Sequence, residues 1–316
     1  MSERLRIAVL GDPHIGYPAD DRWDDVVADI NSLAPTAVFV VGDLTGYGPS
    51  TGTSAAIRHA GRKLDGLAVP WYSVIGNTDL QAPEFTTDEE AVGSFLTVAR
   101  RDSPWFRVDL GPLSVVGLSG TSFRRNSETH HEIVFEAEQL DWFAAQLDEL
   151  ANRPVFVIAH APPIGSGLLT MPELHAHLGN AVVSQNHNPG RVTKIIWNHP
   201  NVLVWFSGHN HLGHCYRNAI SVALGVHFVH AGAATETRDG LRHSRVVDIY
   251  PDRFEVLTFD HAVRRLDESL TYSEPTSLAG LLAWRTEMKG RLYLARDPET
   301  MRQGPPLEAI HEPGIA

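Results

Sequence analysis

Short hydrophobic runs that end at polar or glycine-rich turns recur along the chain and predict buried β-strands. They are rich in Val, Ile and Phe, residue types that favour strands. Six such runs occupy 6–12 (RIAVLGD), 36–43 (TAVFVVGD), 71–77 (WYSVIGN), 113–119 (LSVVGLS), 154–160 (PVFVIAH) and 202–209 (VLVWFSGH). The first two thirds of the chain is therefore expected to be a series of buried strands with longer connections between them.

Segments with helical periodicity lie between several of these runs. The pattern is clearest over 138–151, where one face carries four hydrophobic residues at helical spacing: Leu140, Phe143, Leu147 and Leu150. That stripe predicts a helix packed on the core. Further helices are expected over 20–33, 53–67, 190–198 and 277–290. Strands that alternate with helices predict an α/β fold with at least partly parallel strands.

Three later runs follow one another without long helices between them. They cover 227–234, 244–250 and 253–259. Successive strands of this kind are typical of antiparallel pairing, so we expect them to form a second, more antiparallel sheet.

The segment 161–200 is long and rich in Gly, Pro, Asn and His. Connections of this length in a folded domain are often functional lids or insertions. We therefore expect a domain over 1–260 in which 161–200 forms an insertion or cap that shapes a pocket over the site. Residues 261–316 are expected to add a C-terminal helix and a Pro-rich tail that packs on this domain.

Composition limits the class of protein. A chain of 316 residues with 43% hydrophobic residues can bury a sizeable core. The single Cys215 excludes an internal disulfide framework and a four-cysteine zinc site, and it fits a reducing compartment. The first apolar run is too short for a signal peptide, and no stretch approaches the length of a membrane span. We expect a cytoplasmic protein with no membrane partner.

The formal net charge of -12 restricts the partners further. Proteins that bind duplex nucleic acid need a basic face that displaces counterions from the phosphates, so no duplex nucleic-acid partner is expected. An acidic surface also repels anionic substrates at long range. Phosphate chemistry in this protein would therefore need strong local positive charge, which bound cations can supply.

Polar residues that can bind metals follow most of the predicted strands: Asp12 and His14, Asp43, Asn77 and Asp79, His160, and His209 and His211. In open α/β sheets ligands bind beyond the carboxyl ends of the strands, so these residues are expected to converge. Histidine is the commonest metal ligand, and 204–215 (VWFSGHNHLGHC) holds three histidines within six residues. Two carboxylates, an amide oxygen and four imidazoles form a mixed set that suits manganese, iron or zinc.

The order of these motifs is more specific than any one of them. Asp-x-His, Gly-Asp, Gly-Asn-x-Asp, His and Gly-His-x-His, each after a predicted strand, together resemble the calcineurin-like metallophosphoesterase superfamily over Ile7 to about His214. The resemblance implies an α/β fold, a four-layer α/β/β/α sandwich with two mixed β-sheets flanked by helices. The stretch GYGP at 46–49 is similar to an element of its small bacterial phosphodiesterase-like branch.

The resemblance also implies a site and an activity. Asp12, His14 and His211 would bind one metal, Asn77, His160 and His209 the other, and Asp43 would bridge the two. Two divalent ions, manganese, iron or zinc, would then hold a bridging hydroxide for in-line attack on a small phosphate ester, with phosphodiesters preferred. Because the carboxylates cancel only part of the metal charge, phosphate would be attracted to this point of an acidic protein.

The sequence departs from the family at Thr78, where a histidine is usual. A threonine hydroxyl donates a hydrogen bond but cannot act as an acid near pH 7. Alternatives therefore stay open: a phosphomonoesterase, a metal-binding or scaffolding protein weakened by Thr78, and a two-metal hydrolase of a non-phosphate bond. The candidate catalytic residues are Asp43, Asn77, Thr78 and Asp79, and the candidates for substrate contact are Arg124, His131, His175 and His187.

Overall fold

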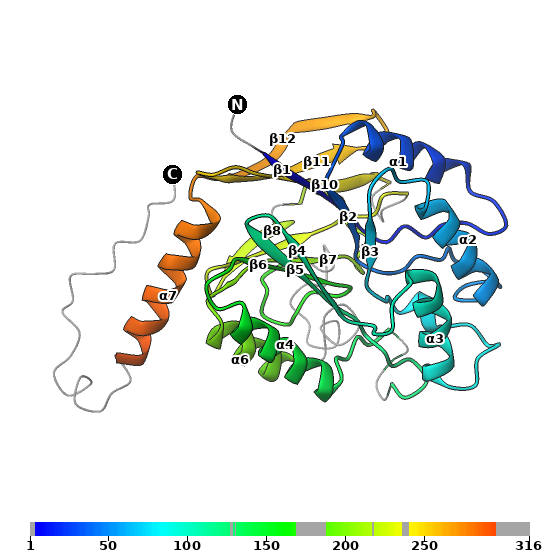
Figure 1. The fold of residues 1–316 in the computed structure, drawn as a ribbon. Helices are drawn as coiled ribbons and strands as arrows, with labels where there is room; N and C mark the ends of the chain where they lie inside the picture. Colours follow the sequence, from blue (N-terminus) through cyan, green and yellow to red (C-terminus); the bar gives the residue numbers. More distant parts are fainter. Residues whose placement is uncertain are drawn as a thin grey trace.

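Two β-sheets of six strands each form the centre of the structure (Figure 1). The computed structural model describes residues 4–126, 129, 131–168, 188–216, 218–235 and 240–294. Along the chain the elements are β1 (Leu5–Leu10), α1 (Asp21–Ser32), β2 (Ala37–Val40), α2 (Ser54–Leu64), β3 (Trp71–Ser73), the 3-10 helix η1 (Thr78–Leu80), α3 (Asp88–Ala99), β4 (Phe106–Leu110), β5 (Leu113–Leu118), α4 (Ala137–Glu149), β6 (Val155–Ala159), α6 (Pro189–Asn198), β7 (Val202–Ser207), β8 (Ile220–Ala223), β9 (Val226–His230), β10 (His243–Ile249), β11 (Phe254–Asp260), β12 (Arg265–Glu274) and α7 (Leu278–Leu294).

Both sheets are mixed, and each contains a run of parallel strands. The first sheet has the order β12-β11-β10-β1-β2-β3, in which β1, β2 and β3 are parallel and β10 to β12 pair antiparallel. The second has the order β4-β5-β6-β7-β9-β8, in which β5, β6, β7 and β9 are parallel. The strands that precede the predicted site residues all belong to these parallel runs, so their carboxyl ends point the same way within each sheet.

The later strands do not form a sheet of their own, contrary to the sequence-based expectation. Strands β10 and β11 extend the first sheet next to β1, and β9 joins the second sheet next to β7. Strand β12, which lies beyond residue 260, also belongs to the first sheet, where it pairs with β11. The first sheet is therefore built from both ends of the folded chain.

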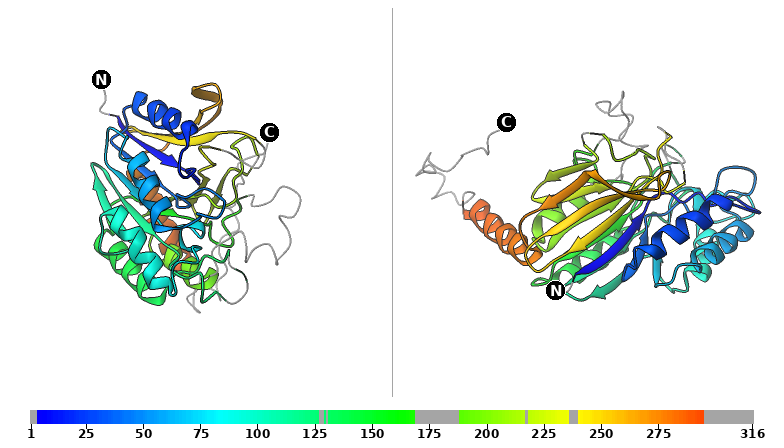
Figure 2. Two further views of the ribbon diagram at one scale, coloured as in Figure 1. Left: turned by 90° about the vertical axis from the view of Figure 1, so that its right-hand side faces the viewer. Right: turned by 90° about the horizontal axis from the view of Figure 1, so that it is seen from above.

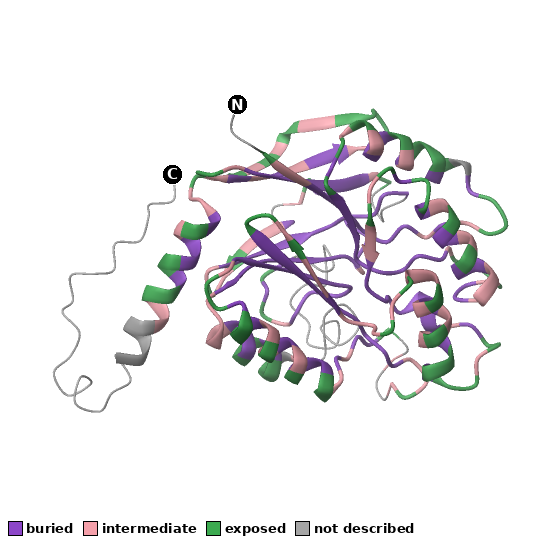
Figure 3. Ribbon diagram, viewed as in Figure 1, coloured by how far each residue is buried: buried purple, intermediate pink, exposed green. Residues whose placement is uncertain are grey.

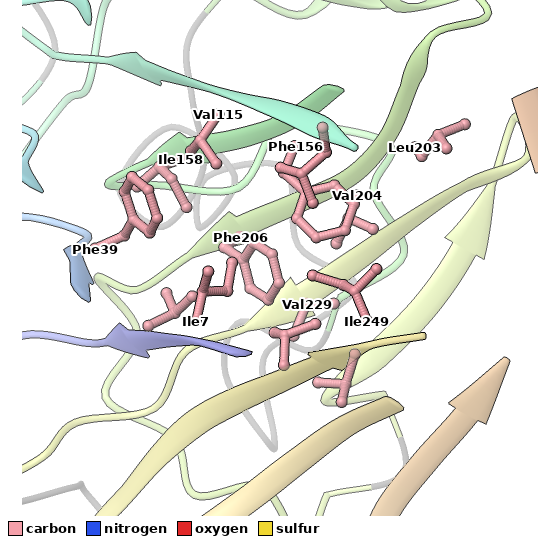
Figure 4. Close-up of a cluster of buried hydrophobic side chains, with 14 of the residues drawn as sticks. Ile7, Phe39, Val115, Phe156, Ile158, Leu203, Val204, Phe206, Val229 and Ile249 are labelled. Atoms are coloured by element: carbon pink, nitrogen blue, oxygen red, sulfur yellow. The ribbon is translucent and has the colours of Figure 1, made fainter. Parts of the chain in front are cut away.

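The two sheets pack face to face around a hydrophobic core (Figure 4). Alternation along β1 divides its side chains between two layers, because successive residues of a strand point to opposite faces. Ile7 and Val9 belong to the cluster between the sheets, together with Phe156 and Phe206 of the second sheet. Ala8 belongs to a different cluster on the outer face. The continuous hydrophobic runs are therefore strands covered on both sides.

Helices cover the outer face of each sheet and complete four layers (Figures 1 and 2). The outer cluster of the first sheet contains Trp23 of α1, Leu64 of α2 and Phe95 of α3. The outer cluster of the second sheet contains the α4 stripe and residues of α6, among them Phe143 and Val192. The buried strands and half-exposed helices are visible in Figure 3. This is the α/β/β/α sandwich expected from the sequence.

Helix α7 follows β12 and begins on the core between the sheets, where Leu278, Leu281 and Leu282 are buried. Its Arg285 is also buried and donates hydrogen bonds to the backbone carbonyls of Ile196 and Val202. Among the helices of the described residues, none combines the length and apolar character needed to cross a bilayer.

Candidate metal centre

The seven predicted metal ligands lie in loops that begin at the carboxyl ends of five strands. Asp12 and His14 follow β1, Asp43 follows β2, Asn77 follows β3, His160 follows β6, and His209 and His211 follow β7. Five of them have positive φ angles: Asp12 (38°), His14 (42°), Asp43 (54°), His209 (68°) and His211 (50°). This backbone conformation is costly for residues other than glycine, and it concentrates at functional sites. Sharp turns directly after the strands therefore set the positions of these side chains.

One group of side chains gathers Asp12, His14, Asp43 and His211, whose ligand atoms all lie within 4.8 Å of one another. The Nε2 atoms of His14 and His211 are 2.9 Å apart. His211 Nε2 is 3.4 Å from Asp12 Oδ1, and His14 Nε2 is 3.7 Å from Asp43 Oδ2. These contacts converge on one point with nitrogen and oxygen atoms.

A second group lies on the other side of Asp43. His160 Nε2 is 3.1 Å from Asn77 Oδ1 and 3.1 Å from His209 Nδ1. The same His160 Nε2 is 3.5 Å from Asp43 Oδ1. Asp43 thus directs one carboxylate oxygen toward each group, as a residue shared by two cation sites would.

Hydrogen bonds to the backbone fix the tautomers of two of the imidazoles. His160 Nδ1 is 2.7 Å from the carbonyl oxygen of Val41, and His14 Nδ1 is 3.1 Å from that of Thr45. Because a carbonyl oxygen only accepts, each Nδ1 carries a proton, and in the neutral form of each ring Nε2 is the nitrogen with the lone pair. Those lone pairs face carboxylate and amide oxygens, which also only accept. A cation between them would resolve this clustering of acceptors, and a hydrogen bond from the other ring nitrogen to a backbone carbonyl is typical of metal-binding histidines.

Charge interactions favour the metal-binding forms of these groups. Burial is the largest influence on His14 and lowers the pKa of its imidazole. Burial opposes ionisation of Asp43, but the neighbouring His160 and His14 outweigh it and lower the pKa of its carboxyl. The pKa of Asp12 is lowered in the same way by His211 against the effect of burial. Neutral imidazoles and ionised carboxylates are the forms that bind divalent ions.

Two glycines allow the close approach of the loops. A Cβ at Gly76 would lie 2.2 Å from Asp43 Oδ1, and a Cβ at Gly208 would lie 2.2 Å from Asp12 Oδ2. Both carboxylates also accept backbone N–H groups, since His209 donates to Asp12 at 2.9 Å and Thr78 donates to Asp43 at 2.9 Å. The glycines of the Gly-Asn and Gly-His motifs are therefore steric requirements of the cluster.

Asp79 is a positioning residue that joins two of the loops. Its buried carboxylate accepts the N–H groups of Asp43 (3.0 Å), Leu44 (2.8 Å) and Gly76 (3.0 Å). Burial raises the pKa of Asp79 to about 7, while these N–H donors favour its ionised form. The family's acidic residue at this place is expected to hold a histidine, and here it holds backbone instead.

Thr78 takes part through its backbone. Its side chain is 1% exposed, and its buried hydroxyl has no hydrogen-bond partner among the described residues. The N–H group of Thr78 donates to Asp43 Oδ1. The hydroxyl is therefore not presented at the surface of the site, where the expected role of a hydrogen-bond donor would require it.

The predicted substrate contacts divide into three cases. Arg124 donates to the carbonyls of Leu80, Ala82 and Phe85 and pairs with buried Asp88, so its guanidinium supports a loop of the fold. His131 is exposed and its Nδ1 lies 3.4 Å from Nδ2 of Asn77, at the edge of the cluster. His175 and His187 lie outside the described residues, as do residues 169–187 of the expected cap.

Sequence reasoning missed one residue at the site. The ring of Tyr47 stacks on His14, with centroids 4.4 Å apart and an angle of 26° between the planes. The only sequence signal for Tyr47 was the GYGP stretch, which was interpreted as a feature of the family and not as part of the site. Cys215, by contrast, is exposed and takes no part in the cluster as described.

Comparison with known proteins bears on both fold and site. A profile of the calcineurin-like phosphoesterases matches residues 5–213, the part of the chain that carries the whole cluster. No curated protein matches the chain.

Several solved structures share the fold. A dimetal phosphatase from Danio rerio is 16% identical with a TM-score of 0.62, and the match covers 86% of this chain and 99% of that one. The purple acid phosphatase PPD1 from yellow lupin (Lupinus luteus) seeds is 12% identical with a TM-score of 0.62, covering 89% of this chain and 55% of the lupin chain. GAP50, described as the anchor in the inner membrane complex of Plasmodium, is 11% identical with a TM-score of 0.52, and the match covers 87% of this chain and 89% of the GAP50 chain. At these identities the likeness concerns the fold alone.

Proposed function

Because the chain belongs to the calcineurin-like phosphoesterase family, we propose that it hydrolyses phosphate esters with two divalent cations, and that phosphodiesters are its preferred substrates. One observation carries the proposal. Asp43 directs Oδ2 toward His14 and Oδ1 toward His160, so a single carboxylate lies between two groups of ligand atoms. A site for one ion needs no such shared residue, whereas a carboxylate between two groups of ligands can hold two cations close together, as two-metal hydrolysis requires.

The residues that would hold the cations are those of the two groups, with Asp12, His14 and His211 on one side, Asn77, His160 and His209 on the other, and Asp43 between them. Manganese, iron or zinc suits this mixed nitrogen and oxygen set. Such a pair of cations supplies Lewis-acid charge and lowers the pKa of water at the site. The protein contributes fixed ligand orientations through the backbone bonds of His14 and His160.

His131 is the proposed phosphate contact in place of the histidine that Thr78 replaces. Asn77 offers its Nδ2 donor to His131 Nδ1, so the neutral ring carries its proton on Nε2. That N–H is a donor for a phosphoryl oxygen, and the ring is exposed. The buried hydroxyl of Thr78 cannot provide this contact.

The preference for diesters rests on charge. A phosphomonoester dianion carries more negative charge than a diester and needs more cationic support. Arg124, the side chain expected to clamp a phosphate, is occupied by Asp88 and backbone carbonyls. A diester makes a smaller demand on the remaining site.

The test compares the manganese-loaded protein on bis(p-nitrophenyl) phosphate and on p-nitrophenyl phosphate. We expect faster turnover of the diester, inhibition by phosphate or vanadate, and loss of at least a thousandfold in turnover with Asp43→Asn, about what removal of a central catalytic group costs. Asp24→Asn, on the exposed face of α1, is the matched control and keeps wild-type activity.

Each alternative has its own outcome in this test. Faster turnover of p-nitrophenyl phosphate would assign a monoesterase. Full metal occupancy without turnover under manganese, iron or zinc would assign a metal-binding or scaffolding protein. Turnover of carboxyl esters that phosphate and vanadate do not inhibit would assign a hydrolase of a non-phosphate bond.

A further inference from the structure

Exposed apolar side chains gather where strand β8 meets helix α7. Val222 of β8 is 57% exposed, Leu224 of the following turn 44%, and Trp284 of α7 49%. Gly225 and Trp284 line two adjoining cavities, of which the first is also lined by Leu224 and the second by Val222. We refer to Val222, Leu224 and Trp284 as the β8–α7 surface. Three of the six large hydrophobic side chains that are exposed among the described residues therefore belong to one surface.

The first cavity has the size of a side chain. Its volume is about 190 Å³, and its walls include Trp197, Pro200 and Met288. Pockets for small molecules usually measure about 300–1,000 Å³. Helix α7, which forms one side of the cavity, projects from one side of the sandwich (Figures 1 and 2). The shape therefore suits side chains that another protein surface inserts.

Strand β8 is an edge strand without the charges that protect such strands. An exposed edge offers free N–H and C=O groups to other chains, and charged residues or proline usually prevent this pairing. The edge strand β4 has Arg107 and Asp109, and the edge strand β12 has several charged residues. Strand β8 reads ISVA and has none. In the part of the chain that the structure describes, no strand pairs with its outer edge.

The turn between β8 and β9 has a leucine where a small polar residue is usual. Leu224 has a φ angle of 54° and Gly225 one of 70°. Two-residue turns with two positive φ angles favour Asn-Gly or Asp-Gly, and this conformation is costly for a leucine. A Cβ at Gly225 would lie 2.7 Å from the ring of Trp284, so the ring rests on the turn. Neither the turn nor burial in the core accounts for the leucine side chain.

The two cavities carry opposite charges. Arg285 and Lys289 line the first, where both donate to backbone carbonyls and form no ion pair among the described residues. The carboxylate of Glu274 lines the second. Its neighbour at 3.2 Å is His227, whose pKa is lowered by burial, and no Lys or Arg of the described residues pairs with it. The surface thus has an apolar centre between a cationic and an anionic end.

We propose that the β8–α7 surface is the interface of a homodimer in which a two-fold axis relates two copies of this chain. Such an axis places a surface against its own copy in the opposite direction, and every contact occurs twice. The cationic first cavity of one copy then faces the anionic second cavity of the other. Leu224 of each copy inserts beside Trp284 of the other, and the outer edges of the two β8 strands come together.

This dimer leaves the metal centre open and does not depend on the proposed function. Strands β7 and β9 are parallel, with Val204 opposite His227. The predicted ligands His209 and His211 follow the carboxyl end of β7, whereas the turn with Leu224 precedes the amino end of β9. The interface and the metal centre therefore lie at opposite ends of these strands.

A different occupant of the surface would be a segment of the same chain. Residues 295–316 follow α7 and lie outside the described residues. A segment of the same chain would cover the surface at every protein concentration, whereas a second copy dissociates on dilution. The two occupants are therefore separated by the mass of the protein as a function of its concentration.

The experiment is sedimentation velocity of the full chain from about 1 to 100 µM, a range that brackets micromolar dissociation constants. Leu224→Asn removes the apolar side chain and restores the residue that the turn favours, so its free energy of unfolding should not fall. Trp284→Gln removes the ring from α7. Val263→Asn is the matched control, because Val263 is 55% exposed and lies between β11 and β12, outside the surface.

We expect the wild type to have twice the mass of one chain at about 10 µM. Leu224→Asn and Trp284→Gln should each raise the dissociation constant at least about 100-fold, because each removes two central contacts of a symmetric interface. Val263→Asn should leave the dissociation constant unchanged. Lys289→Glu and Glu274→Lys should each weaken the dimer about tenfold, and the double variant should recover most of the wild-type affinity.

A wild type that remains monomeric at the highest concentration overturns the proposal. If Leu224→Asn then also lowers the free energy of unfolding, the surface is covered by a segment of the same chain. A dimer that neither Leu224→Asn nor Trp284→Gln weakens has its interface elsewhere and refutes the assignment. Additive losses in the double variant of Lys289 and Glu274 would refute the two-fold arrangement.

Discussion

Replacing Asp79 with asparagine tests how two loops of the metal centre are held together. Oδ2 accepts the N–H groups of Asp43 and Gly76, and Oδ1 accepts that of Leu44. An asparagine amide keeps only one acceptor oxygen. In its best orientation this oxygen takes the place of Oδ2, and the amide NH2 then faces the N–H of Leu44. Two buried donors, the N–H of Leu44 and the new amide NH2, are then left without acceptors.

The expected cost follows from this count. Each buried unsatisfied donor costs about 1–3 kcal/mol. Part of that loss is offset, because burial already raises the pKa of Asp79 to about 7 and the substitution removes a buried charge. We expect the free energy of unfolding to fall by about 2–4 kcal/mol. Since Asp79 orients the backbone of Asp43, we also expect manganese affinity to fall by about 10–100-fold.

Urea denaturation of the metal-free protein measures the first effect, and calorimetric titration with manganese measures the second. Asp88→Asn is the matched control. Asp88 is a buried carboxylate that accepts the N–H groups of Phe123 (3.2 Å) and Arg124 (2.9 Å), outside the metal loops. The Asp88→Asn variant should have a lower free energy of unfolding and an unchanged affinity for manganese. Unchanged stability and affinity in Asp79→Asn would refute the reasoning, because the three N–H groups would then have other acceptors.

Three further predictions follow from buried or crowded positions. Thr78→Val should raise the free energy of unfolding in urea by about 1 kcal/mol, because it removes a buried hydroxyl without a partner among the described residues. A fall in the free energy of unfolding would mean that the hydroxyl forms a hydrogen bond. Gly76→Ala should abolish manganese binding, since its Cβ would lie 2.2 Å from Asp43 Oδ1. Gly93→Ala in α3 is the control, because a Cβ at Gly93 would have no atom within 4 Å. This variant should keep manganese binding, and its free energy of unfolding in urea should rise by about 1 kcal/mol. Burial of Asp88 opposes ionisation, but N–H groups of Arg124 and Phe123 lower the pKa of its carboxyl. The stability this gives is full above the ordinary carboxyl pKa of about 4 and is lost as the pH falls below it, so the stability gap between wild type and Asp88→Asn should narrow in acid; a constant gap would contradict the assignment.

Local sequence patterns determined much of the fold and the candidate ligands. Continuous hydrophobic runs predicted the parallel strands, and the stripe with Phe143 and Leu147 predicted α4. The polar residues were predictable because each is joined covalently to the end of a strand, as Asp12 is to β1 and His160 to β6. Where parallel strands end at one edge, residues distant in sequence must meet there.

Elements without a strong hydrophobic pattern were missed. Strand β12 lies at the edge of its sheet and has no buried residue, so no alternation distinguishes it from a loop. Helix α3 buries little beyond Ala91 and Phe95, and its clearest signal is the capping box of Thr87 and Glu90. Edge strands and peripheral helices are held by neighbours more than by their own composition.

Only the tertiary structure decided which distant groups became partners. It placed β10 and β11 beside β1, directed Arg124 to Asp88, and brought Tyr47 onto His14. Hydrophobic periodicity predicts that a strand is buried but does not predict which strand lies next to it, since many pairings bury the same residues. A polar side chain likewise shows its chemistry in the sequence, while its partner depends on how separate loops pack. Consecutive residues determined the helices and strands. The contacts between side chains at the site arose from packing between segments far apart in the chain.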